Sequence, residues 1–157
     1  MENITYHKAG PNDLQALIDN RIAFTLELAG PQSSEDIASL KKGLKSYFTE
    51  TLKTNASIWY IAKAGSAVAG IGGLVFRLHP GNFKTPSGRS GYIINMYTVP
   101  AFRKKGVCSG ILNALIDDAR RSGVNFFELH ATKAGEFAYI KNGFIIHNEP
   151  TYRKYTE

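Results

Sequence analysis

The segment from Asn95 to Phe144 constrains the fold most, because it predicts a strand, a basic glycine-containing loop, a helix, a strand and a second helix in succession. The apolar run 92–99 favours a strand, which Pro100 ends. Across 107–119 apolar residues recur at helical spacing, so the basic loop leads directly into a helix. Free N–H groups at the start of that helix, beside three cationic side chains, predict a phosphate or pyrophosphate site. The candidate residues are Arg103, Lys104, Lys105, Gly106, Val107, Cys108 and Ser109.

The rest of the chain predicts two more helices and several strands. Helices are expected from residue 12, where Asn12 and Gln15 form a capping box, and from Ser33, which caps a helix running to about residue 54. A break rich in proline and glycine at 79–91 predicts a long loop. The predicted strands cover 4–8, 57–64, 67–78, 124–130, 144–147 and 151–155, with a hairpin turn at Gly65-Ser66.

This order of elements predicts a mixed α/β fold with helices on both faces of the sheet. We expect about six to seven strands and about four helices in a single domain covering 1–157, since 157 residues with 43% hydrophobic content suffice for one core.

The run Gly70-Ile71-Gly72-Gly73 lies inside an apolar stretch that no helix follows. It therefore predicts a bulged or close-packed strand and not a dinucleotide loop.

Composition narrows the class of protein. A single cysteine excludes an internal disulfide and a cysteine-cluster metal site, so no metal is expected. The N-terminus is polar and no apolar run of about 18 residues occurs, which favours a cytoplasmic protein with no membrane association. The net charge is +6, but the lysine and arginine residues are scattered along the chain, so binding to nucleic acid is not favoured. A salt-dependent affinity for DNA or RNA would be the sign of such binding.

Three short patterns resemble those of one protein family. Arg103 and Gly106 match the loop pattern Q/R-x-x-G-x-G/A, with Cys108 where glycine or alanine is usual. The run Asn95–Pro100 is similar to the strand before that loop, and Tyr139–Phe144 is similar to the pattern Tyr-x-Lys-x-Gly-Phe. In this order they resemble the GCN5-related N-acetyltransferase (GNAT) superfamily, over residues 57–147.

The resemblance implies acetyl transfer from acetyl-CoA to a primary amine by direct attack in a ternary complex. It places the pyrophosphate on residues 103–109 and the pantetheine arm along the backbone of Met96, Tyr97 and Thr98, where two parallel strands separate. A backbone N–H of that strand would also face the thioester oxygen. Tyr139 is then the candidate acid that protonates the departing thiolate.

The sequence alone leaves the general base, the acceptor and the oligomeric state undecided. The general base could be Glu27, Glu128, His130 or His79, and Thr132 stands where many members of the superfamily carry an asparagine. The acceptor is expected to be a small-molecule amine or a peptide amine, and a homodimer is left open. An alternative of another class is a non-catalytic module that binds acyl-CoA as a sensor.

Overall fold

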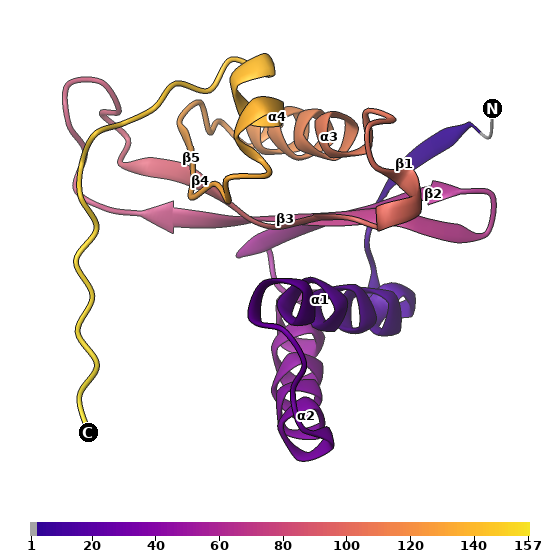
Figure 1. Ribbon diagram of the computed structural model, residues 1–157. Helices are drawn as coiled ribbons and strands as arrows, with labels where there is room; N and C mark the ends of the chain where they lie inside the picture. The colour runs from indigo at the N-terminus through magenta and orange to yellow at the C-terminus, as the bar shows by residue number, and fades with distance from the viewer. Residues whose placement is uncertain (1–2) are drawn as a thin grey trace.

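A computed structural model describes residues 3–157, and within them five strands form one sheet between two layers of helices (Figure 1). The strands lie side by side in chain order: β1 (Ile4–Lys8), β2 (Ser57–Ala64), β3 (Ala67–Leu78), β4 (Arg89–Thr98) and β5 (Phe127–Leu129). The first four are antiparallel, whereas β4 and β5 are parallel. The mixed α/β class predicted from the sequence is confirmed.

The helices cover both faces of the sheet. Figure 1 shows α1 (Leu14–Ala29) and α2 (Ser34–Thr51) on one face and α3 (Val107–Arg121) and α4 (Glu136–Lys141) on the other. Ser33 caps α2 as predicted, because its hydroxyl accepts the Asp36 N–H at 3.0 Å. The predicted Asn12 capping box is wrong. The chain instead enters α1 through a 3₁₀ turn at Pro11–Asp13, where the Asp13 carboxylate accepts the Gly10 N–H at 2.9 Å.

Each face of the sheet has its own apolar core. The core under α3 is built from the helix residues that recur at helical spacing, Ile111, Leu112 and Leu115, which are fully buried. The core under α1 and α2 includes Leu17, Phe48, Trp59, Ile61 and Ile71. Strand β2 is buried at both alternations because it lies between these two layers.

The glycine run in β3 is close-packed, as predicted, and it lies opposite a bulge in β4. A Cβ atom on Gly73 would overlap the Trp59 ring, and one on Gly72 would overlap Met96 and Ile111. The pairing of β3 with β4 slips here, because Ile71 pairs with Tyr97 whereas Gly73 pairs with Ile94. Two residues of β4 therefore oppose one residue of β3, which defines a β-bulge.

The predicted count of six to seven strands is wrong for the described residues. The strand expected at 124–130 shortens to Phe127–Leu129, and the expected strands at 144–147 and 151–155 do not form. The last residues instead run extended past the edge of the sheet (Figure 1), and their apolar side chains are exposed. An alternating pattern predicts a strand, but a strand forms only by pairing with a neighbouring strand, and residues 144–155 pair with none among residues 3–157.

The loop between β3 and β4 is a shorter one than predicted, since β4 already begins at Arg89. A hydrogen bond joins the two ends of this loop, with the His79 N–H donating to the Gly88 carbonyl at 3.0 Å.

Among the described residues, no helix is long and apolar enough to cross a membrane.

Candidate functional site

The sheet opens where β4 passes the end of β5. Strand β5 pairs only with residues 91–93 of β4, so residues 94–98 have no neighbouring strand on that side within the described chain. The bulge lies in the same stretch, and Asn95 adopts a left-handed backbone with φ of 55°. The predicted positions Met96, Tyr97 and Thr98 all belong to this open edge, although the Thr98 carbonyl already accepts the Arg103 Nε–H at 3.1 Å.

The basic loop forms an open cradle at the start of α3. Lys104 and Gly106 both have left-handed backbones, with φ of 61° and 80°, and Gly106 is the N-cap of the helix. Apart from Gly106 and its neighbours along the chain, no atom lies within 4 Å of where a Cβ on Gly106 would stand. The N–H groups of the first helical turn, at Val107, Cys108 and Ser109, have no acceptor within the helix. The cradle has the donors, the positive helix end and the room that a pyrophosphate needs.

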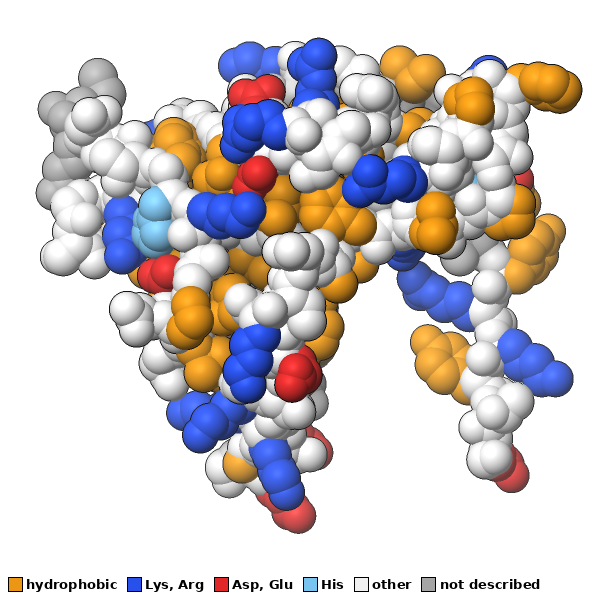
Figure 2. All heavy atoms as spheres, turned by 180° about the vertical axis from the view of Figure 1, so that it is seen from behind, with side chains coloured by type: hydrophobic (Ala, Val, Ile, Leu, Met, Phe, Trp, Pro, Cys, Tyr) orange, Lys and Arg blue, Asp and Glu red, His pale blue; other side chains and the backbone are white. Residues whose placement is uncertain are grey.

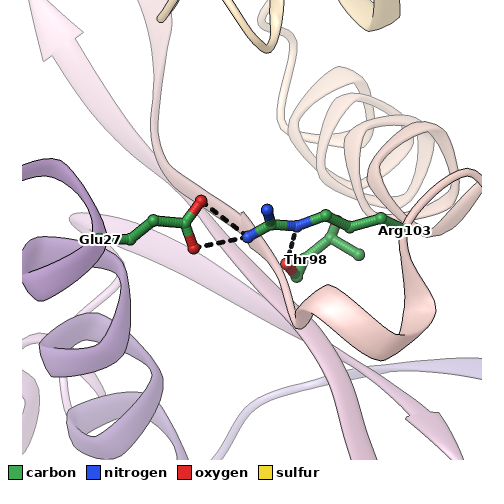
Figure 3. Close-up of polar contacts among 3 residues, drawn as sticks. All are labelled: Glu27, Thr98 and Arg103. Atoms are coloured by element: carbon green, nitrogen blue, oxygen red, sulfur yellow. Dashed lines mark hydrogen bonds and ion pairs between the residues drawn. The ribbon is translucent and has the colours of Figure 1, made fainter.

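Arg103 does not point freely into that cradle. Its guanidinium is bound to both carboxylate oxygens of Glu27 in α1, at 2.8 and 2.6 Å, and to the Thr98 carbonyl (Figure 3). The bond to Glu27 raises the pKa of Arg103. Arg103 thus fastens the loop to α1 across the sheet edge, and Lys104 and Lys105 remain the exposed cations of the loop.

Tyr139 lies on α4 beside the first turn of α3. Its ring packs edge-on against Phe144, with 6.1 Å between ring centroids, and it is half-buried near Cys108. Burial, and secondly the charge of a Cys108 thiolate, raise the pKa of the Tyr139 hydroxyl far above its usual range. The Asn142 amide donates to the Ser109 hydroxyl at 2.8 Å and holds α4 against α3. The raised pKa of Tyr139 keeps its hydroxyl protonated at neutral pH.

Cys108 is a packed residue in this arrangement. Its thiol is half-buried, and burial raises its pKa, so the thiolate is disfavoured.

On the α1 side of the same open edge lies a pocket with a volume of about 430 Å³. We call it the Arg21 pocket. The half-buried Arg21 side chain donates from Nη1 to Oδ1 of Asn95 at 3.2 Å, and the two residues are 74 positions apart in the chain. The pocket is lined by Arg21, Leu44, Tyr47, Phe48, Trp59, Tyr92, Ile93, Ile94, Asn95 and His130.

No sequence motif includes Arg21. One signal was present: Leu14, Leu17, Ile18, Arg21 and Leu28 fall on one face of α1, so Arg21 is a cation within an apolar stripe.

The four base candidates lie in different surroundings. Glu27 is engaged by Arg103, His79 lies in the exposed β3–β4 loop, and Glu128 is exposed on β5. Only His130 lines the Arg21 pocket, where its Nδ1 is hydrogen-bonded to the Tyr92 hydroxyl. Among residues 3–157, no three His, Cys, Asp or Glu side chains gather as metal ligands would.

Comparisons with known proteins agree with this geometry. A protein from Clostridium acetobutylicum described as a predicted acetyltransferase and solved with acetyl-CoA is 30% identical, with a TM-score of 0.84 over 97% of this chain and 96% of that chain. A GCN5-related N-acetyltransferase from Ralstonia eutropha JMP134 is 21% identical, with a TM-score of 0.83 over 97% and 99% of the two chains, and shares the fold.

Another structure with this fold is AAC(6')-Iy in complex with the bisubstrate analogue CoA-S-monomethyl-acetylneamine, at 14% identity and a TM-score of 0.72 over 98% and 99% of the chains. A search of curated proteins gave no match. The model of the acetyltransferase (GNAT) family matches residues 23–144, most of the chain. This chain belongs to the acetyltransferase (GNAT) family.

Proposed function

We propose that this protein transfers an acetyl group from acetyl-CoA to a primary amine by direct attack in a ternary complex. One observation carries the proposal: the open edge of β4 leads straight into the cradle at the start of α3, with Tyr139 beside that cradle. The N–H groups of residues 106–109, with Lys104 and Lys105, would hold the pyrophosphate. The backbone of Met96 and Tyr97 would pair with the pantetheine amides in the manner of an added strand.

The remaining chemistry is proton transfer. Acetyl-CoA supplies an activated acetyl group as a thioester. The Tyr139 hydroxyl is protonated at neutral pH and would give its proton to the departing thiolate. A backbone N–H of the open β4 edge would stabilise the oxyanion of the tetrahedral intermediate.

His130 is the base that the pocket supports. It is the one of the four sequence candidates that lines the Arg21 pocket on the face of the sheet opposite α4. An amine in this pocket would therefore lose its proton on one side of the open edge, while Tyr139 acts on the other. Glu27 is less suited, because its carboxylate is paired with Arg103.

The proposal is tested by incubating the protein with acetyl-CoA and a panel of amines, peptides and aminoglycosides. Release of free coenzyme A is followed with a thiol reagent, and the acetylated product is identified by mass spectrometry. Amine-dependent release with a product heavier by one acetyl group supports the proposal. Release that does not depend on any amine would mean hydrolysis and would contradict it.

A non-catalytic module that binds acyl-CoA is the alternative. Tight acetyl-CoA binding without transfer to any amine would favour it. Nucleic-acid binding has less support, because Lys and Arg are distributed over the face in Figure 2 among other side chains and do not gather in one patch. A salt-dependent affinity for DNA or RNA would be the evidence in favour of nucleic-acid binding.

We further propose that residues 1–157 act as one domain in the cytoplasm and assemble as a homodimer. The apolar side chains of the C-terminal tail support the dimer, since Ile145, Ile146, Tyr152 and Tyr155 are each at least 76% exposed. Light scattering coupled to size-exclusion chromatography measures the mass directly. A monomer at high protein concentration would refute this assembly.

A further inference from the structure

Arg21 is a cation with no ionic partner among the residues that the structure describes. It projects from the apolar face of α1, and its guanidinium carbon lies 5.7 Å from the centroid of the Phe24 ring. Among the ion pairs of residues 3–157 none includes Arg21, and its one hydrogen bond goes to the neutral Asn95 amide. Burial lowers the pKa of Arg21, which marks the loss of water around the charge. Such a charge is costly unless an anion pairs with it.

The Asn95 side chain places a second hydrogen-bond donor beside Arg21. A guanidinium can only donate, so the Asn95 atom that faces Arg21 is the oxygen, and Nδ2 points the other way. That Nδ2 is buried and has no acceptor among the described residues. Asn95 also holds a left-handed backbone at the bulge of β4. A strained residue with an unmet donor beside an unpaired cation is more typical of a binding site than of a structural core.

The walls of the Arg21 pocket carry no opposing charge. Its lining contains no carboxylate from the part of the chain that the structure describes. Tyr47, Trp59 and Tyr92 supply aromatic surface, and Leu44 with Ile94 supplies aliphatic surface. Three other ionisable groups lie nearby. His130 is in the lining, the Arg77 guanidinium lies 3.5 Å from the centroid of the Tyr92 ring, and Glu128 pairs with Tyr92 in the sheet but lies outside the lining.

We propose that the acceptor is a small amine that also carries a carboxylate, with Arg21 binding the carboxylate and the aromatic wall binding an apolar group. This inference rests on the proposed acetyl transfer and specifies its substrate class. A guanidinium pairs with a carboxylate through two parallel N–H bonds, which fixes the acceptor's orientation as well as its charge. A polycationic amine would be repelled by Arg21, so the pocket discriminates against aminoglycoside-like acceptors.

The test compares matched acceptors on the wild type and on Arg21→Gln. The probes are L-phenylalanine, its carboxamide, phenethylamine and the polycation neamine, with O-phosphoethanolamine to separate a carboxylate from a phosphate. We expect kcat/KM for L-phenylalanine to exceed that for the carboxamide at least tenfold, and Arg21→Gln to abolish that ratio. Acetyl-CoA affinity should stay unchanged. Arg120→Gln, an exposed arginine on α3, is the matched control and should retain the ratio.

Two further measurements separate this inference from the proposed function. Binding of N-acetyl-L-phenylalanine and of its carboxamide, measured by ligand-observed NMR with coenzyme A present, needs no turnover. We expect only the acid to bind the wild type, and neither to bind Arg21→Gln more than weakly. Arg21→Gln should also raise the melting temperature of the ligand-free protein, because it removes an unpaired half-buried charge.

The outcomes are distinct. If neutral amines are acetylated as well as acids and Arg21→Gln leaves that ratio unchanged, the carboxylate assignment is wrong and acetyl transfer stands. If no probe is acetylated but the acid binds through Arg21, the anion site stands and the proposed transfer fails. If the acid and the carboxamide bind equally, or phosphate replaces the carboxylate, the inference is overturned.

Discussion

Tyr139→Phe removes one hydroxyl from α4 and keeps the ring that packs against Phe144. Burial and the charge of Cys108 account for the raised pKa of this hydroxyl, and no hydrogen bond within residues 3–157 contributes to it. Its loss should therefore alter the free energy of unfolding by no more than about 0.5 kcal/mol. If the hydroxyl protonates the departing thiolate, turnover should fall by roughly ten- to a thousand-fold, a barrier increase of about 1.4–4 kcal/mol.

The assay measures kcat for a good acceptor by coenzyme A release, together with acetyl-CoA affinity by calorimetry and the melting temperature of both proteins. A lower kcat with unchanged affinity and unchanged melting temperature isolates the proton transfer from binding and folding. Equal kcat values for the Phe variant and the wild type would remove Tyr139 from the mechanism and leave solvent as the proton source.

The same variant gives a check on the raised pKa of Tyr139. A raised folded-state pKa contributes stability that is fully present below the unfolded value, near ~10, and that is lost as pH rises toward the folded value. The wild type should therefore lose stability between about pH 10 and pH 11.5 more steeply than Tyr139→Phe. Parallel melting curves across that range would contradict the raised pKa.

Three further substitutions test the cradle and the fold. Gly106→Val places a β-branched residue at a φ of 80° beside the open cradle, so it should cost about 1–2 kcal/mol of stability and weaken acetyl-CoA binding at least tenfold by calorimetry. Cys108→Ala should keep most activity, whereas Cys108→Leu should lose acetyl-CoA affinity, because Cys108 is half-buried in the first turn of α3. An inactive Ala variant that still binds acetyl-CoA would argue for a chemical role of the thiol. Ser33→Ala removes the N-cap of α2 and should cost about 1 kcal/mol, or roughly 2–4 °C in melting temperature, with no effect on catalysis.

The sequence predicts best those features that local chemistry decides. The Gly65-Ser66 turn, the Ser33 cap and the helix after Gly106 each depend on residues within a few positions of one another, and each forms as expected. The glycine run of β3 is also predicted correctly as part of a strand, since it stands in an apolar run without a following helix.

Features decided by distant contacts were not predictable in the same way. The Arg103–Glu27 pair joins residues 76 positions apart, and no local pattern shows that Glu27 is unavailable as a base. The closing strands were predicted wrongly for a related reason: the alternation at 144–157 is local, but a strand needs pairing with a distant part of the chain, and residues 144–157 do not pair with the sheet in the described chain. The contact of Arg21 with Asn95 likewise appears only once α1 lies across β4.

Three costly features meet along β4: an open strand edge at residues 94–98, a left-handed Asn95, and the half-buried charge of Arg21. Each would lower the stability of a ligand-free fold, by unmade hydrogen bonds, backbone strain and charge burial respectively. A ternary complex would relieve two of them, since a pantetheine arm would pair the edge and an acid group would neutralise Arg21. Ligands that bind only the folded state stabilise it by mass action. We therefore expect coenzyme A and a carboxylate-bearing amine, which cannot react with each other, to raise the melting temperature together by more than either alone, because the edge and Arg21 flank the same bulge.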